Sequence, residues 1–370
     1  MPPRQREVLQ RLTACRTPAL GGALHYCPEC DHRHFSYHSC NDRHCPQCGG
    51  QNTQEWLIDN AALLLPVNHF LVTFTVPDGL RRWIRSHPAL GYDLLLAASS
   101  QALQDLAQNP KRLGATLGLL GVLHTWTRTL EYHPHVHYLV AGGGLSLDQR
   151  QWISSPPKFL LPVKALSDRC RTLFREALEK RMPEALADLP NKVWTQRWVV
   201  HSAAVGSGQK ALSYLSRYVF KTATGNRQVQ LLPNGRLRWP FRQSGTGKWQ
   251  QIQLEPFEFL RRFLQHVLPS SFHRVRRFGW LHPGARPKLK RVRALLKMPP
   301  LLSTPEQAFW APPSPSAQAH PIPAVQAQVL TPAPLCCPHC GSKLAMIGQW
   351  RPGQSPRATL PAVQRTIRPP

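Results

Sequence analysis

The segment His133-Pro134-His135-Val-His137-Tyr-Leu-Val140 alternates imidazoles with other side chains and then becomes apolar. Residues two apart along a strand share a face, so a strand here points His135 and His137 the same way. Two neutral imidazoles that point at one position make half of a metal site, which needs at least one more ligand. Pro134 keeps His133 at the start of the strand, so we place the metal on His135 and His137.

The apolar segment before this stretch supplies a candidate for the third ligand. If residues 117–127 and 135–140 form a hairpin, His124 lies opposite the two histidines. Glu131, in the turn between the two segments, is the alternative ligand. The histidines could instead fill a polar sheet face without binding any metal, and the sequence leaves that alternative open.

Hydrophobic periodicity predicts the elements around this hairpin. The predicted helices cover residues 53–65, 80–108 with a break near Pro88, 163–182, 209–222 and 257–267. The predicted strands cover residues 69–76, 193–203 and 249–254, and a hairpin turns at residues 233–235. A mixture of this kind predicts an α+β fold.

The helix predicted over residues 209–222 carries Tyr214 and Tyr218 at a spacing of four. A helix turns about 100° per residue, so both phenols lie on one face, away from the apolar stripe. Three cations lie on or beside that face: Lys210, Arg217 and Lys221. Phenols flanked by cations suit attack on a phosphodiester, because cations favour the phenolate and bind the phosphate. Two surface tyrosines that stack on single-stranded bases are the alternative.

Six of the ten cysteines lie within the first 48 residues. Cys27-Pro-Glu-Cys30 and Cys45-Pro-Gln-Cys48 are matching turns, and each turn points two thiolates at one ion. Two such turns complete a closed tetrahedral site for zinc. The sequence therefore predicts a structural zinc ion on these four cysteines.

Other cysteines remain outside these two turns. Cys15 and Cys40 either form a second site with nearby histidines, or Cys40 replaces one of the four predicted ligands. In the tail, Cys337-Pro-His-Cys340 resembles half of a zinc knuckle, with no second pair after it. From Pro299 onward 16 of 72 residues are proline, which predicts a largely disordered tail.

The whole chain is strongly basic, because 46 Lys and Arg against 19 Asp and Glu give a formal charge of +27 over 370 residues. This imbalance favours a polyanionic partner, either nucleic acid or an acidic membrane surface. The sequence lacks an apolar run of about 18 residues, which argues against an integral membrane protein. The polar start does not resemble a signal peptide, so we expect a cytoplasmic, nucleoid-associated protein without a membrane partner.

Residues 261–297 carry a strong excess of positive charge, with eleven Lys and Arg and no acidic residue. We expect this segment to contact a nucleic-acid backbone, with binding that falls steeply as salt rises. The candidate contacts are Arg261, Arg262, Arg274, Arg276 and Arg277. A solvated basic surface is the alternative.

Together these motifs resemble the HUH superfamily of single-strand endonucleases. Within it, the chain closely resembles the rolling-circle, two-tyrosine insertion-sequence transposases of the insertion sequence ninety-one family. The resemblance runs through the cysteine-rich opening, residues 70–77, His124-Thr-Trp126, the stretch from His133 to His137, Gly142–Gly144, Tyr214-Leu-Ser-Arg-Tyr218 and residues 259–269.

The resemblance implies two parts: a zinc-ribbon-like DNA-recognition domain over 1–66 and an HUH palm with the catalytic domain over 67–298. The proline-rich tail over 299–370 lies outside the resemblance. It implies that Mg²⁺ or Mn²⁺ binds His135 and His137, with His124 as the third candidate ligand. Tyr214 and Tyr218 would be the paired nucleophiles.

A transposase of this kind nicks and rejoins single-stranded DNA at insertion-sequence ends through 5′-phosphotyrosine intermediates. Three other functions are alternatives to this one. A plasmid rolling-circle initiator or relaxase shares the chemistry, and an inactive zinc-dependent DNA-binding remnant shares the architecture. A histidine-triad nucleotide hydrolase would match the alternating histidines, but not the cysteine turns, the charge or the tyrosine helix.

Overall fold

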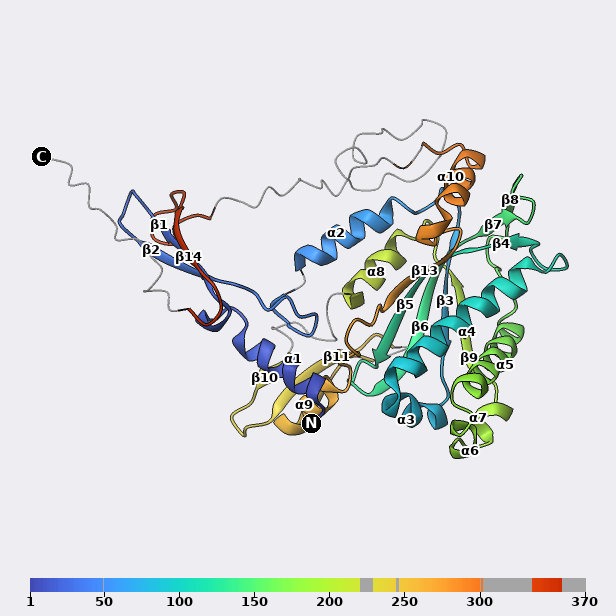
Figure 1. Ribbon diagram of the computed structural model, residues 1–370, viewed down its shortest axis with the longest axis horizontal. Helices are drawn as coiled ribbons and strands as arrows, with labels where there is room; N and C mark the ends of the chain where they lie inside the picture. The colour runs from blue at the N-terminus through green and yellow to red at the C-terminus, as the bar shows by residue number, and fades with distance from the viewer. Residues whose placement is uncertain (49, 220–228, 244–245, 300, 302–334, 355–370) are drawn as a thin grey trace, which may run out of the picture.

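A five-stranded antiparallel sheet organises the chain (Figure 1). The computed structural model describes residues 1–48, 50–219, 229–243, 246–299, 301 and 335–354. The strand order is β13-β5-β6-β3-β9, with bounds Val275–Gly279, Gly118–Trp126, Tyr132–Ala141, His69–Thr75 and Val199–Ala204. The predicted α+β class and the predicted hairpin of residues 117–140 are confirmed, and β6 lies at the centre of the sheet.

One face of the sheet carries the main hydrophobic core. Side chains that alternate along β6, Val136, Tyr138 and Val140, are fully buried there. They pack with helices α3 (Asp78–Ser86), α4 (Pro88–Gln108) and α5 (Val163–Arg181). The predicted break near Pro88 is confirmed, because proline fits the first turn of α4 but not the interior of a helix.

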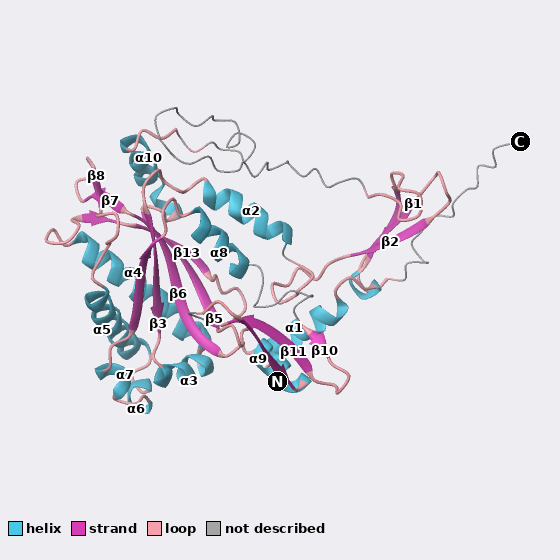
Figure 2. Cartoon of the chain, turned by 180° about the vertical axis from the view of Figure 1, so that it is seen from behind, coloured by secondary structure: helices cyan, strands magenta, loops and turns pink. Residues whose placement is uncertain are grey.

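The opposite face of the sheet is covered by helices α2 (Gly50–Ala61) and α8 (Gln209–Val219) (Figure 2). The apolar stripe of α8 packs on Leu120 and Val122 of β5 and Leu139 of β6. Because residues two apart share a face, this is also the face of the sheet from which His135 and His137 project. The fold thus brings the tyrosine helix onto the histidine strand.

The sheet's outer elements differ from the prediction in two places. The strand predicted to begin at residue 193 begins at Val199, after the short helix α7 (Lys192–Thr195). Strand β13 was not predicted at all, although it forms an edge of the central sheet and pairs with β5. The strand could not be predicted because it contains Arg276 and Arg277. A basic strand at a sheet edge lacks the apolar alternation that is typical of buried strands.

Smaller elements surround the central sheet. Two small antiparallel sheets have the orders β4-β7-β8 and β10-β11-β12. Their bounds are Ala115–Thr116, Gly143–Ser146, Trp152–Ser154, Gln230–Leu231, Leu237–Arg242 and Trp249–Leu254. The remaining helices are α6 (Ala185–Asp188), α9 (Pro256–Leu264), α10 (Arg286–Leu295) and the short turn Pro283–Ala285. The predicted hairpin at residues 233–235 is the turn between β10 and β11.

The cysteine-rich N-terminal segment forms a module whose strands stand apart from the central sheet (Figures 1 and 2). It begins with α1 (Pro3–Ala14) and the turn Pro18–Leu20, and continues into the hairpin β1 (Gly22–Tyr26) and β2 (Arg33–Tyr37). Strand β14 (Ala345–Trp350), from the proline-rich tail, pairs with β1. Within the described chain, no helix has the length and apolar character needed to cross a membrane.

Candidate functional site

Three histidines meet on the face of the sheet beneath α8. In the β5–β6 hairpin, His124 lies directly opposite His135, and Val122 lies opposite His137. One ligand nitrogen from each of the three imidazoles lies within 4.8 Å of the others. The structure therefore brings His124 to the predicted pair, while the alternative ligand Glu131 does not join this cluster of described residues.

Hydrogen bonds to the outer ring nitrogens orient two of these imidazoles. Nδ1 of His135 lies 2.6 Å from the carbonyl oxygen of His133, and Nδ1 of His137 lies 2.7 Å from Oγ1 of Thr73. An Nδ1–H donor on His135 leaves its Nε2 lone pair free for a cation. Among the described residues, the buried Nε2 of His137 has no hydrogen-bond partner, which fits a nitrogen that can coordinate a cation.

The three imidazoles are held in the neutral form that binds metals. Burial, followed by the charges of the neighbouring imidazoles, lowers the pKa of His124 well below its usual value. Burial also lowers the pKa of His135 to about 4 and that of His137 to about 3. At neutral pH a cation therefore has no ligand proton to displace, and the donor set fits a divalent cation.

Tyr214 projects from α8 toward this cluster. Its ring centre lies 5.9 Å from that of His137 and 6.5 Å from that of His124. The side chain is 39% exposed, whereas Leu212, Leu215 and Val219 on the apolar stripe of the helix are buried. The expected separation of the phenol from the apolar stripe is therefore confirmed for Tyr214.

The rest of the predicted tyrosine face is only partly described. The side chains of Tyr218 and Arg217 and the whole of Lys221 lie outside the described residues. Lys210 is exposed on the first turn of α8. The roles assigned to these residues stay predictions.

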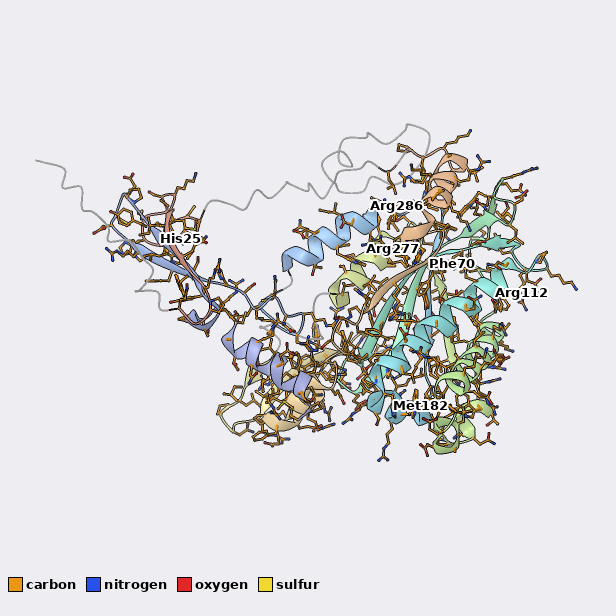
Figure 3. All side chains as sticks on the ribbon, in the orientation of Figure 1. His25, Phe70, Arg112, Met182, Arg277 and Arg286 are labelled. Atoms are coloured by element: carbon orange, nitrogen blue, oxygen red, sulfur yellow. The ribbon has the colours of Figure 1, made fainter. Side chains whose placement is uncertain are left out.

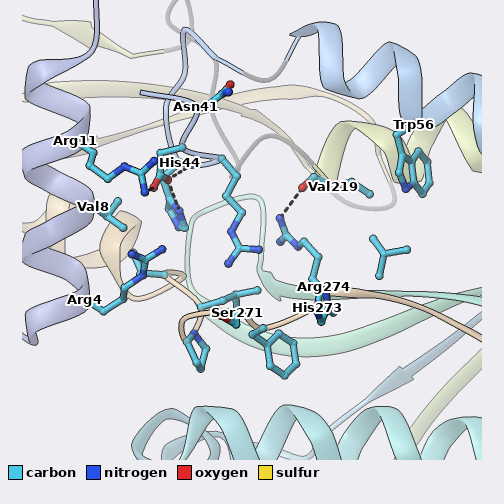
Figure 4. A pocket seen from close by; sticks show the side chains of 17 residues that line it. Arg4, Val8, Arg11, Asn41, His44, Trp56, Val219, Ser271, His273 and Arg274 are labelled. Carbon is cyan, nitrogen blue, oxygen red and sulfur yellow. Dashed lines mark hydrogen bonds and ion pairs between the residues drawn. The ribbon is translucent and has the colours of Figure 1, made fainter. Parts of the chain in front are cut away.

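A pocket of about 540 Å³ lies between the N-terminal module and the central sheet (Figure 4). It is lined by α1, by the loop around Asp42 and Arg43, by the end of α8 at Val219, and by the segment that leads into β13 at Arg274. Arg274 donates a hydrogen bond to the carbonyl oxygen of Val219 at 3.2 Å. The pocket thus opens beside the helix that carries Tyr214.

The pocket is positively charged. In the described chain, Arg43 and Arg274 have no carboxylate within ion-pair distance, and burial lowers the pKa of both guanidinium groups. Asp42 is the one carboxylate in the described lining, and it is already engaged by His44 at 3.5 Å and Arg11 at 3.9 Å. Burial would raise the pKa of Asp42, but these partners lower it to about 2. Asp42 therefore stays ionised and paired with His44 and Arg11.

A chain of aromatic contacts joins the pocket to the histidines. The guanidinium carbon of Arg274 lies 5.3 Å from the ring centre of Trp126. The ring of Trp126 stacks on His124 at 5.7 Å, with 11° between the ring planes. The charge of residues 261–297 was enough to predict Arg274 as a DNA contact. Arg43 was not predicted, because only the folded chain brings it into the same pocket.

Several other residues predicted to contact DNA have partners within the protein, and their contact with DNA stays a prediction. Arg261 and Arg262 both bind Glu258, at 2.6 and 2.7 Å. Arg276 pairs with Asp93 at 2.5 Å, and Arg277 donates to Oδ1 of Asn60 at 3.0 Å (Figure 3). These four residues lie on α9 and β13, so the segment 261–297 is folded structure and not only a basic surface.

The structure corrects the predicted grouping of the cysteines. Cys45 and Cys48 come together with Cys15 and Cys40, whereas Cys27 and Cys30 lie in a different cluster. The sequence could not find this division, because a Cys-x-x-Cys turn fixes where its own two thiols point and not which distant pair completes the site.

The first cluster lies entirely within the N-terminal module. The Sγ atoms of Cys15 and Cys48 and of Cys15 and Cys45 are 3.5 Å apart, and those of Cys40 and Cys48 are 3.8 Å apart. All four thiols are buried. These separations exceed a disulfide bond and suit four sulfurs around one Zn²⁺, which stand about 3.8 Å apart.

The second cluster joins the two ends of the described chain. Cys27 and Cys30 of the β1–β2 turn meet Cys337 and Cys340 of the tail. The tail turn predicted as half of a zinc knuckle therefore has its second half in the N-terminal module. The described residues 335–354 form a turn and the strand β14.

Comparison with known proteins agrees with this combination of modules. Residues 1–76 match the family described as "Transposase zinc-binding domain", and residues 118–289 match the family described as "Putative transposase". A bacterial tRNA(His) guanylyltransferase-like protein solved with ATP matches at a TM-score of 0.19 and 10% identity, covering 59% of this chain and 99% of that one, which is too remote to inform the fold.

Two curated relatives extend over most of the chain. The "Putative transposase y4qJ" of Sinorhizobium fredii is 38% identical over 80% of this chain and 79% of its own length. The "Transposase for insertion sequence element IS801" of Pseudomonas savastanoi pv. phaseolicola is 30% identical over 91% of this chain and 82% of its own length. With its cysteine-rich module and its histidine sheet, the chain belongs to the insertion-sequence transposases of the IS91 family.

Proposed function

We propose that this transposase nicks and rejoins single-stranded DNA at the ends of its insertion sequence, through 5′-phosphotyrosine intermediates, in rolling-circle transposition. The observation that carries the proposal is the approach of Tyr214 to the cluster of His124, His135 and His137, at 5.9 Å between the ring centres of Tyr214 and His137. A nucleophile and a candidate cation site on one sheet face can act on a single phosphate.

The proposed reaction is a direct exchange of phosphoester bonds. The phenol oxygen of Tyr214 or Tyr218 attacks the scissile phosphorus, the bond to the 3′ oxygen breaks, and the proton lost by the phenol is balanced by protonation of that oxygen. The products are a 5′-phosphotyrosine and a free 3′-hydroxyl, so the bond energy is kept for rejoining. Mg²⁺ or Mn²⁺ bound by the three imidazoles would neutralise charge on a non-bridging oxygen.

The guanidinium-lined pocket supports DNA as the partner. Arg43 and Arg274 bring buried positive charge next to the C-terminal end of α8. A backbone phosphate of DNA can form ion pairs with these guanidinium groups there. We assign this pocket to the strand that leads to the tyrosines. The cluster of Cys15, Cys40, Cys45 and Cys48 would hold structural zinc, which fixes the loop that carries Arg43.

The test is the double substitution Tyr214→Phe and Tyr218→Phe. Each change removes only the phenol oxygen, so folding and DNA binding are expected to persist. The purified variant is incubated with single-stranded element ends and Mn²⁺, and covalent protein–DNA adducts are measured on a denaturing gel. We expect adducts with the unaltered protein and none with the double variant.

Tyr26→Phe is the matched control, because Tyr26 lies on β1 in the N-terminal module and not on α8. It should form adducts at the unaltered rate. Adducts that persist in the double variant would overturn the nucleophile assignment. The plasmid initiator alternative predicts cleavage at a replication origin and not at element ends, so a substrate of each kind separates the two functions.

A further inference from the structure

The cysteine cluster at the ends of the described chain is built from two matching turns. Cys27-Pro-Glu-Cys30 and Cys337-Pro-His-Cys340 share the pattern Cys-Pro-x-Cys. In each turn the first cysteine donates its backbone N–H to the carbonyl oxygen five residues later, to His32 at 2.9 Å and to Ser342 at 2.7 Å. The chain forms the same local structure twice.

The turns also match in backbone conformation. The residue after the second cysteine has a positive φ in both, 54° at Asp31 and 78° at Gly341. This conformation is unfavourable for most side chains and is adopted readily by glycine and, at some cost, by aspartate. Two turns that share this bend and the same hydrogen bond are arranged to present their thiols alike.

The thiols of the two turns face one another across the module. Sγ of Cys27 lies 3.4 Å from that of Cys340, and Sγ of Cys30 lies 3.6 Å from that of Cys337. These distances are far beyond a disulfide bond and close to the spacing of about 3.8 Å around a tetrahedral Zn²⁺. The rings of His32 and His339 stack at 5.7 Å beside the cluster.

Strand pairing brings the tail to this position independently of the thiols. β14 runs antiparallel to β1, from Gly22 opposite Trp350 to Tyr26 opposite Ala345. Trp350 is buried, with its ring 6.0 Å from Phe35 and 5.9 Å from Tyr37. A Cβ at Gly22 would collide with the backbone carbonyl oxygen of Ser36 on β2 and would stand 2.9 Å from the Trp350 ring, so this glycine leaves room for both neighbouring strands.

We propose that Cys27, Cys30, Cys337 and Cys340 bind a zinc ion of their own, which clasps the C-terminal segment onto the N-terminal module. The full zinc complement is then two ions per chain. Binding forms four Zn–S bonds and releases the protons of those thiols that were protonated. The proposal does not depend on the phosphotyrosine chemistry.

The first test counts zinc in the full-length chain. Protein purified without chelator is analysed by mass spectrometry of its metal content, and we expect two zinc ions per chain. Cys337→Ser with Cys340→Ser should remove one ion, and Cys45→Ser with Cys48→Ser should remove the other. Cys336→Ser, a change at the neighbouring thiol outside the cluster, should keep both.

One zinc ion in the unaltered chain, or two in the variant that lacks Cys337 and Cys340, would overturn the proposal. Misfolding is checked with Co²⁺ in place of zinc. The visible absorption of thiolate-bound tetrahedral Co²⁺ should fall by half in either double variant, because each variant still has one intact four-thiol site. Complete loss of this signal in the tail variant would also contradict two independent sites.

A second test asks whether the metal holds the tail in place. A site for a specific protease is inserted between residues 315 and 316, and the cleaved protein is passed over a size-exclusion column. The C-terminal fragment should co-elute with the body, and should separate from it after a strong zinc chelator or in the Cys337→Ser, Cys340→Ser variant. Co-elution that survives chelation would show that strand pairing alone holds the tail, and would overturn the clasp.

Discussion

Thr73 orients one imidazole of the histidine cluster from the neighbouring strand. It lies on β3 directly opposite His137 of β6, and its hydroxyl contacts Nδ1 of that imidazole at 2.7 Å. Partners of this kind fix the tautomer and the ring orientation of a metal ligand. The neighbouring strand therefore supplies an orienting group that the histidine pattern itself does not reveal.

Replacing Thr73 with valine should weaken the proposed cation site without unfolding the sheet, since valine has nearly the shape of threonine. We expect the Mn²⁺ concentration needed for half-maximal adduct formation to rise by about 10- to 100-fold. Thr73→Ser keeps the hydroxyl and should stay near the unaltered value. An unchanged Mn²⁺ requirement in the valine variant would mean that Thr73 does not orient His137.

At the residue scale, much of the candidate site could be predicted from the sequence. The alternation of His135 and His137 is a local pattern, and pairing of neighbouring strands was enough to suggest His124. Arg43 could not be found in this way. It lies in a cysteine loop far along the chain from Arg274, and only packing of the N-terminal module against the sheet brings the two to one pocket.

Arg43 should contribute to DNA binding through one phosphate contact. Arg43→Gln removes the charge, so affinity for single-stranded DNA should fall for every sequence, and the slope of log affinity against log salt should become shallower by up to about 1. Arg82→Gln, on the exposed side of α3, is the control and should change neither quantity by as much. Equal slopes for Arg43→Gln and the unaltered protein would exclude this contact.

At the scale of elements, strand β13 depends on a glycine at its end. Gly279 has φ of 63°, and a Cβ there would stand 1.7 Å from the carbonyl oxygen of Leu117 and 2.6 Å from Nε2 of Gln104. Gln104, on α4, holds both backbone groups of Leu117 at 2.9 and 3.1 Å. The close approach lets β13 pair with β5 while α4 packs over the same edge.

Gly279→Ala should therefore destabilise the protein by at least about 2 kcal/mol, because backbone and not a flexible side chain would have to move. Gly235→Ala is the matched control: φ is 79° there, but nothing lies within 4 Å of the added Cβ. It should cost only about 1 kcal/mol. Urea unfolding followed by circular dichroism measures both, and equal midpoints for the two variants would contradict this account.

For the whole molecule, the excess of arginine has a structural explanation beside the functional one. With only 19 acidic residues available, several guanidinium groups bind backbone carbonyls instead. Arg293 donates to the carbonyl oxygens of Pro299 and Ala62, Arg291 to that of Gln149, and Arg274 to that of Val219. These side chains join distant segments, so the charge of +27 is not all available to DNA.

Local sequence patterns were enough to predict the α+β class, most of the helices and strands, the histidine pair and the cysteine turns. Each of these is encoded within a few residues, by alternation, by helical spacing or by a turn motif. Only the folded chain shows how the cysteine turns combine, that the basic segment contributes a strand, and that Arg43 and Arg274 line one pocket. These features could not be predicted because they join residues far apart in the chain, such as Cys27 and Cys340. A local pattern identifies the chemistry of a residue but not the distant residue with which it pairs.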